Sequence, residues 1–273
     1  MSRSARLALP LMLMLGLSTL ASAGPTATGV HASTVADSLQ TATAALLGRL
    51  GSERTATGTV PLRADPTLTS IAQARASDMA TRGYFGHTAP DGTDFADLLE
   101  ASGMAWLGGG ETIAWNTAPD LGMSLDMASD GWMLSASHRD VLLSGDFNYA
   151  GVGAATAGDR VYWAVVVVKG PDHTAPSASI QAPRVGTATS SGKRSVTVGW
   201  RATDPPLAVL TAGVGAYQLQ WRRTGGAWQT RSWTTATSLR LSLPTGQRFE
   251  FRVRARDRAG NVGGWTRAVT ART

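Results

Sequence analysis

The sequence predicts an α+β protein of two modules, a three-layer α/β/α sandwich followed by an all-β sandwich. In the first half, Ala and Leu recur with helical spacing around an unbroken apolar run, "VYWAVVVV" at residues 161–168. Such a run is typical of a strand buried on both faces, so helices should cover both sides of its sheet. From residue 176 the apolar residues alternate with period two, as antiparallel strands do.

The first 23 residues have the pattern of a secretory signal peptide. Arg3 and Arg6 precede an apolar stretch, Leu7 to Leu20, and a small-residue site ends at Ala23. The alternative is an uncleaved membrane anchor, but 14 apolar residues fall short of the roughly 20 that span a bilayer. We therefore expect a protein that is secreted, extracellular or associated with the cell wall, with a leader at residues 24–40.

The chain contains no cysteine, and its charge is divided unevenly. Disulfides, cysteine nucleophiles and zinc–thiolate sites are therefore excluded. Residues 24–173 carry 8 basic and 16 acidic side chains, a net charge of −8, whereas residues 174–273 carry 15 and 3, a net charge of +12. This asymmetry indicates two modules with different partners.

Three amphipathic helices are predicted in the first module, at residues 35–54, 68–85 and 121–133. Leu68, Ile71 and Ala72 share one stripe of the second helix. Arg75 falls on the same stripe, so its charged end must reach the edge of the buried face or find a partner.

Polar residues interrupt these elements at three places: His87 in "GYFGHTAPDG", Glu111 in "GGGETIAW" and His138 in "SASHRD". Two imidazoles and one carboxylate, which we expect on separate loops, form a known ligand set for catalytic zinc that leaves a position open for water. Their spacing fixes no geometry. The other interpretation is that both imidazoles are hydrogen-bonded loop residues and that Glu111 accepts from nearby backbone amides.

The stretches "SERTATGTVPLRADPTLTSIAQARASDMATRGYFGHTAPDG", "GGGETIA", "WMLSASHRDVLL" and "NYAGVGAA" occur in this order. Together they resemble the CAP family of cysteine-rich secretory and pathogenesis-related proteins, in its bacterial secreted branch, over residues 41–170. The resemblance implies an α/β/α sandwich with a surface cleft. His87, Glu111 and His138 match the family's cleft residues, and some members bind zinc or another divalent ion there.

Three positions depart from the family pattern. Thr112 replaces the usual Asn of the glutamate motif, Gly51 replaces another Asn, and Ser135 stands where many eukaryotic members have a second glutamate. A metal would therefore have at most three protein ligands from this set. The resemblance leaves two functions open: binding of a ligand or partner at the cell envelope, or metal-dependent, peptidase-like hydrolysis with His87, Glu111 and His138 as catalytic residues.

The two remaining histidines are expected to play no part in this site. His31 lies in the predicted leader and His173 in a predicted linker at residues 171–175. Neither has a partner motif nearby, so both are predicted to be exposed to solvent.

Residues 176–273 resemble a fibronectin type III domain, with strands predicted at 194–200, 216–223, 228–234, 238–243, 248–257 and 265–271. Trp200 lies near the place of that family's core Trp, and Phe249 replaces its corner Tyr. This resemblance implies a fold but no specific activity.

Arginines recur at even positions of "RFEFRVRAR", namely at Arg248, Arg252, Arg254 and Arg256, and so share one face of a strand. This basic stripe is either a solvated face, a surface that docks on the acidic first module, or a site that binds anionic wall polymers or phospholipid head groups. No nucleic-acid partner is expected, because exposed aromatic side chains for stacking bases are not evident.

Overall fold

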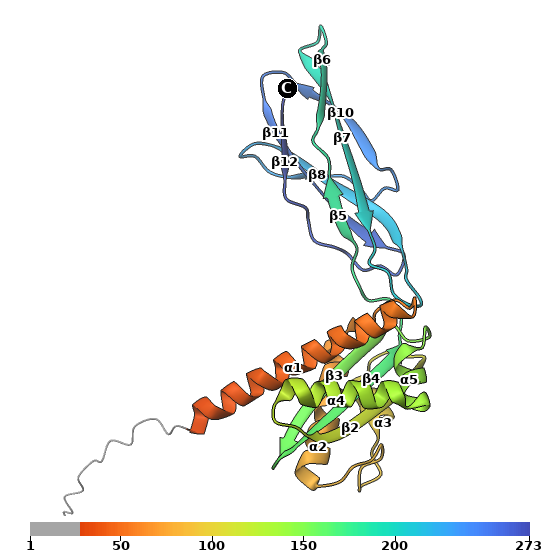
Figure 1. Ribbon diagram of the computed structural model, residues 1–273. Helices are drawn as coiled ribbons and strands as arrows, with labels where there is room; N and C mark the ends of the chain where they lie inside the picture. The colour runs from red at the N-terminus through yellow and green to blue at the C-terminus, as the bar shows by residue number, and fades with distance from the viewer. Residues whose placement is uncertain (1–27) are drawn as a thin grey trace, which may run out of the picture. The chain divides into compact units, whose positions relative to one another are not determined.

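The computed structural model describes residues 28–273, with side chains from Ser38 onward (Figure 1). The predicted signal peptide lies outside the described residues. Helix α1 begins at Thr28, so residues 28–40 of the expected leader are helical. No helix in the described part of the chain is long and apolar enough to cross a membrane.

The first module is built around a four-stranded sheet in the order β1-β3-β4-β2. Strands β1 and β3 are parallel, and the other pairs are antiparallel. The elements are α1 (Thr28–Ala56), β1 (Arg63–Ala64), α2 (Pro66–Arg82), α3 (Phe95–Ser102), β2 (Gly108–Thr117), α4 (Leu121–Leu134), α5 (Ala136–Leu143), β3 (Tyr149–Ala157) and β4 (Arg160–Lys169).

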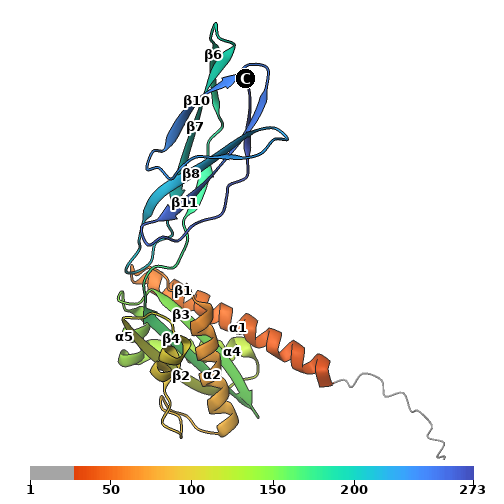
Figure 2. The same ribbon diagram turned by 180° about the vertical axis from the view of Figure 1, so that it is seen from behind.

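Strand β4 separates two apolar cores, which confirms the predicted three-layer sandwich. Val165 and Val167 face the core beneath α1, α4 and α5, whereas Val166 and Val168 face the core beneath α2 and α3. All four valines are fully buried. Figures 1 and 2 show the two sets of helices on opposite faces of the sheet.

Two glycines of β3 let helix α2 lie directly on the sheet. A Cβ atom added to Gly151 would be 2.0 Å from the carbonyl carbon of Leu68, and one added to Gly153 would be 2.2 Å from that of Ala72. Only glycine fits at these two positions without moving the helix. This close contact fixes the distance between helix α2 and the sheet, and so how far the side chains of α2 reach into the core between them.

The C-terminal module is a β-sandwich, as predicted. One sheet has the order β10-β7-β5 with β6 paired to β7, and the other has the order β12-β11-β8-β9. The strands are β5 (Ser177–Ile180), β6 (Arg184–Ala188), β7 (Lys193–Thr203), β8 (Val214–Arg223), β9 (Gln229–Thr230), β10 (Ser238–Pro244), β11 (Arg248–Asp257) and β12 (Val269–Arg272).

The core of the C-terminal module includes Trp200, Phe251 and Val253. Two predicted strands, at 228–234 and 265–271, are shorter than expected: only residues 229–230 and 269–272 pair in a sheet. The reason lies in their tryptophans, which cover arginines on the outer face of the module instead of entering its core.

Candidate functional site

Arg75 and Glu111 form a buried ion pair at the centre of the first module. Arg75 lies on α2 and Glu111 on β2, and their side chains are 2% and 1% exposed. The Arg75 Nε donates to Glu111 Oε1 over 2.8 Å. The prediction that Arg75 needs a partner is confirmed. The prediction that Glu111 lies on a loop is wrong, because the glycines before it belong to strand β2.

The remaining N–H groups of Arg75 hold the chain that follows α2. They donate to the hydroxyl of Tyr84 and to the carbonyls of Gly86 and His87, over 2.7–2.9 Å. Burial acts to lower the pKa of Arg75, but the hydrogen bond and charge of Glu111, together with Tyr84, outweigh burial and raise it. Arg75 therefore stays charged, and its positive charge compensates the negative charge of Glu111.

His87 completes this network at the surface. Its Nδ1 lies 2.8 Å from Glu111 Oε2, and its side chain is 56% exposed. Because an ionised carboxylate can only accept, Nδ1 is the donor and Nε2 is left for a ligand. Both oxygens of Glu111 are thus occupied, one by Arg75 and the other by His87.

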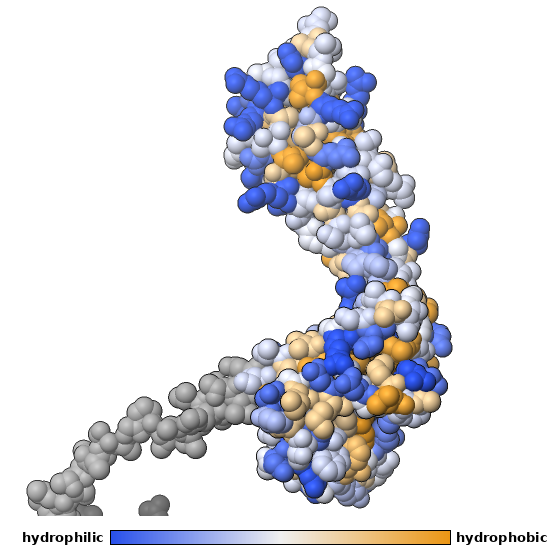
Figure 3. Space-filling view, viewed as in Figure 1, coloured by the Kyte–Doolittle hydropathy of each residue, from blue (hydrophilic) through white to orange (hydrophobic). Residues whose placement is uncertain are grey.

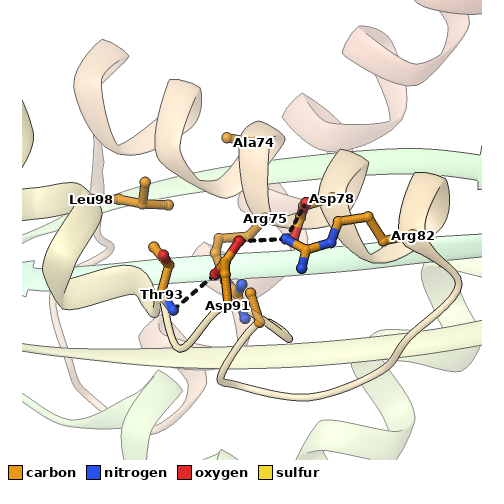
Figure 4. Close-up of a pocket in the computed structure, with 8 residues that line it drawn as sticks. Ala74, Arg75, Asp78, Arg82, Asp91, Thr93 and Leu98 are labelled. Atoms are coloured by element: carbon orange, nitrogen blue, oxygen red, sulfur yellow. Dashed lines mark hydrogen bonds and ion pairs between the residues drawn. The ribbon is translucent and has the colours of Figure 1, made fainter.

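Arg82 also holds the loop that carries His87. Asp91 accepts from the backbone N–H of Thr93 and from Arg82, which also reaches Asp78 (Figure 4). The Thr93 hydrogen bond, followed by that of Arg82, lowers the pKa of Asp91 to about 2. These groups line a pocket of about 240 Å³ behind the loop. The loop that carries His87 is therefore held on both sides.

His138 lies on α5, not on a loop as predicted. Its Nδ1 is 2.8 Å from the hydroxyl of Ser135, the residue at which α4 ends and α5 begins. Burial lowers the pKa of His138, and its electrostatic interaction with His87 acts in the same direction. Among the described residues, no recorded hydrogen bond uses Nε2 of His87 or of His138.

The structure thus brings His87 and Glu111 into contact and places His138 beside them. In the described part of the chain, however, these three do not form a set of ligand atoms within 4.8 Å of one another. Since Glu111 is buried and both its oxygens are used, it orients His87 as a second-layer carboxylate does in metal sites. In this arrangement the two Glu111 oxygens bond Arg75 and His87, and a direct role for Glu111 as a metal ligand stays a prediction.

An aromatic groove, which the sequence did not reveal, adjoins His138. The groove measures about 350 Å³, and His138, Ser135, Trp132 and Trp115 lie along it. Exposed apolar side chains stand at its rim: Phe85 is 49%, Trp115 41% and Met127 47% exposed. A site that combines an apolar wall with a few polar groups is the usual form of a small-ligand site.

His173 is exposed to solvent, as predicted, with 44% of its side chain accessible. It nevertheless has partners: its ring stacks on Tyr149 with centroids 4.1 Å apart, and its Nε2 lies 3.3 Å from Asp65 Oδ2. These contacts form because the segment after β4 lies against the first module. The side chain of His31 lies outside the described residues.

The predicted basic stripe of β11 is an ordered ladder of alternating arginines and tryptophans. Guanidinium groups lie 4.2–5.4 Å from the indole rings that cover them. The sequence pattern did not assign tryptophans to the stripe; the three that accompany it are partly buried, and their faces are covered by arginine. We call this the Arg–Trp ladder; in order it contains Arg222, Trp228, Arg252, Trp265, Arg254, Trp233 and Arg256.

Comparison with known proteins matches residues 47–169 to the cysteine-rich secretory protein family, CAP. The chain is 31% identical over 106 residues to the uncharacterized protein YkwD of Bacillus subtilis, covering 39% of each chain. It is 30% identical over 112 residues to the uncharacterized membrane protein YlbC of the same organism, covering 41% of this chain and 30% of that one. The chain therefore spans well under half the length of these curated relatives.

Among solved structures, the chain is similar to an extracellular protein containing a SCP domain from Bacillus anthracis. The identity is 23% and the TM-score 0.41, and the match covers 48% of this chain and 41% of that one.

Substitution of Arg75 by methionine tests the buried pair. Loss of the guanidinium leaves Glu111 as an uncompensated buried charge, so Arg75→Met should destabilise the first module by about 3–5 kcal/mol in denaturant unfolding. The matched control is Arg49→Met, because Arg49 forms exposed ion pairs with Asp126 and Asp130. Exposed pairs contribute about 0–1 kcal/mol. Equal losses in the two variants would contradict the assigned role of Arg75.

Proposed function

Because residues 47–169 form a CAP domain, we propose that the protein is exported and binds a ligand at the cell envelope in the groove beside His138. One observation carries the proposal: both oxygens of Glu111 are committed, to Arg75 and to His87. A general base must reach the water that it activates, but the Glu111 side chain is only 1% exposed. A proton taken up by Glu111 would also remove the negative charge of its buried ion pair with Arg75, whereas the groove is open.

The groove supports an amphiphilic ligand. Trp115 and Met127 offer partly exposed apolar surface, and His138 and Ser135 offer polar atoms at one end. A ligand with an aromatic or aliphatic body and one polar group would use both. The two imidazoles then recognise the polar group through Nε2.

The alternative is a secreted metal-dependent hydrolase. It is favoured by the free Nε2 atoms of His87 and His138, which could hold Zn²⁺ or another divalent cation while Glu111 orients His87. A bound cation would supply Lewis-acid activation of water or of a carbonyl group. Only two protein ligands would then hold the metal, fewer than the three that are usual at catalytic zinc sites.

Binding of an amphiphilic probe tests the groove. Anilinonaphthalene sulfonate, an aromatic anion, should bind the full chain and shift the NMR signals of the Trp115 indole and the Met127 methyl. Trp115→Ala should weaken binding about tenfold, equivalent to ~1.4 kcal/mol. Leu107→Ala is the matched control, since Leu107 is 70% exposed and lies outside the groove. Equal affinity in wild type and Trp115→Ala would rule out the groove as the binding site.

Zinc titration separates binding from metal-dependent hydrolysis. If the alternative holds, Zn²⁺ added to the metal-free chain shifts the ring signals of His87 and His138 together at a one-to-one ratio, and His138→Ala abolishes the effect. The binding role predicts that His138→Ala keeps the fold and weakens binding of the probe by the loss of one polar contact, with or without Zn²⁺. Unchanged ring signals at millimolar Zn²⁺ would exclude the hydrolase.

We further propose that the Arg–Trp ladder tethers the protein to an anionic wall polymer. The ladder holds its guanidinium faces against indole rings, so little side-chain freedom remains to be lost on binding. In Figure 3, strongly hydrophilic residues surround a small hydrophobic patch on the face of the C-terminal module in view. The net charge of +12 over residues 174–273 (15 basic minus 3 acidic) complements a polyanion.

Binding to isolated cell walls across a salt series tests the tether. Affinity should fall as salt rises, because the attraction is electrostatic. The double variant Arg252→Gln/Arg256→Gln, which removes two arginines of the ladder, should lose about tenfold in affinity, at ~0.7 kcal/mol for each charge. The control is Arg201→Gln/Arg240→Gln, which removes the same charge from exposed positions on the opposite sheet. Salt-insensitive binding, or equal loss in both variants, would contradict the proposal.

A further inference from the structure

Three carboxylates meet where the segment after β4 joins the C-terminal module. Asp172 lies between β4 and β5, Asp204 directly follows β7, and Asp257 ends β11. One oxygen from each lies within 4.8 Å of the other two. The three residues are far apart in sequence, so the fold itself assembles this cluster.

The cluster is unexpected in a module so rich in basic residues. Residues 174–273 contain three acidic side chains against fifteen Lys and Arg. Glu250 pairs with Arg222, but Asp204 and Asp257 lie beside Asp172 instead. In the described part of the chain, no ion pair reaches any of the three. Arg63 and His173 influence them only at longer range.

Two of the three carboxylates are largely removed from water, since Asp257 is 2% and Asp172 7% exposed, whereas Asp204 is partly buried. The Oδ1 atom of Asp204 is itself buried and has no hydrogen-bond partner. Burial, together with the charges of Asp172 and Asp257, raises the pKa of Asp204. A positive group beside the cluster would offset the cost of its negative charge.

Backbone N–H groups orient the other oxygens. Asp172 accepts from the N–H of Thr174 and of Ala212, Asp204 from that of Gly213, and Asp257 from that of Asn261. Each donor lies in an irregular segment outside the named strands. Because a carboxylate oxygen has more than one lone-pair direction, these bonds leave capacity for a cation.

We propose that Asp172, Asp204 and Asp257 bind one Ca²⁺ ion. Oxygen atoms at 2.3–2.6 Å from a shared calcium lie at most about 5 Å apart, which agrees with the observed cluster. An all-oxygen set excludes metals that prefer nitrogen or sulfur ligands. Mg²⁺ fits less well, since it retains several waters and usually binds through only one or two carboxylates. The bound ion fastens the segment around Asp172 to the β-sandwich.

Calcium binding by the full chain, stripped of metal with EGTA, tests this site. Isothermal titration with Ca²⁺ should give one ion per chain, and the midpoint of thermal unfolding should rise with Ca²⁺ concentration. Asp204→Asn, which preserves shape, should lower the affinity at least tenfold. Glu250→Gln is the matched control, because it neutralises the module's third acidic side chain outside the cluster.

Each outcome decides the matter. Binding that Asp204→Asn weakens and Glu250→Gln preserves supports the site. The absence of binding at about 10 mM Ca²⁺, tenfold above the weakest extracellular calcium modules, would overturn it, as would equal binding by Asp204→Asn or equal affinity for Mg²⁺. The site lies outside residues 47–169, so His138→Ala should not change calcium binding. This result does not depend on whether the groove binds a ligand.

Discussion

The buried ion pair between Arg75 and Glu111 is the constraint on which the rest of the first module depends. Helix α2 can bring Arg75 to strand β2 because Gly151 and Gly153 let the helix lie directly on the sheet. The same guanidinium holds the carbonyl of His87, while the carboxylate fixes the ring of that residue. One buried charge pair therefore positions a helix, a strand and a surface loop together.

This arrangement divides the roles of the side chains. Glu111 is an internal orienting group, and ligands meet the two imidazoles and the aromatic groove beside them. The C-terminal module differs from the first module, because its core is apolar and most of its charged side chains lie at the surface. Arginines stack with tryptophans on one sheet face, while two of its three acidic side chains gather at the base with Asp172.

The sequence predicted features that depend on local pattern. The valine run of β4 and the arginine on an apolar helix stripe have the environments expected, and the even-numbered arginines of β11 share one strand face as predicted. Helix α5 was missed because Ser135, Ser137 and His138 break its apolar spacing, and Ser135 serves as the boundary of two helices. The groove, the Arg–Trp ladder and the aspartate cluster depend on long-range contacts that no spacing encodes.

The ring tautomer of neutral His87 tests the central claim most directly. If a buried, ionised Glu111 accepts from Nδ1, then ¹⁵N NMR of the metal-free protein should show, in the form of the ring that carries a single proton, that this proton is on Nδ1. The Nε2-protonated tautomer would contradict the account. Nδ1 would then lack a proton to donate, and Glu111 could not be the group that orients the ring.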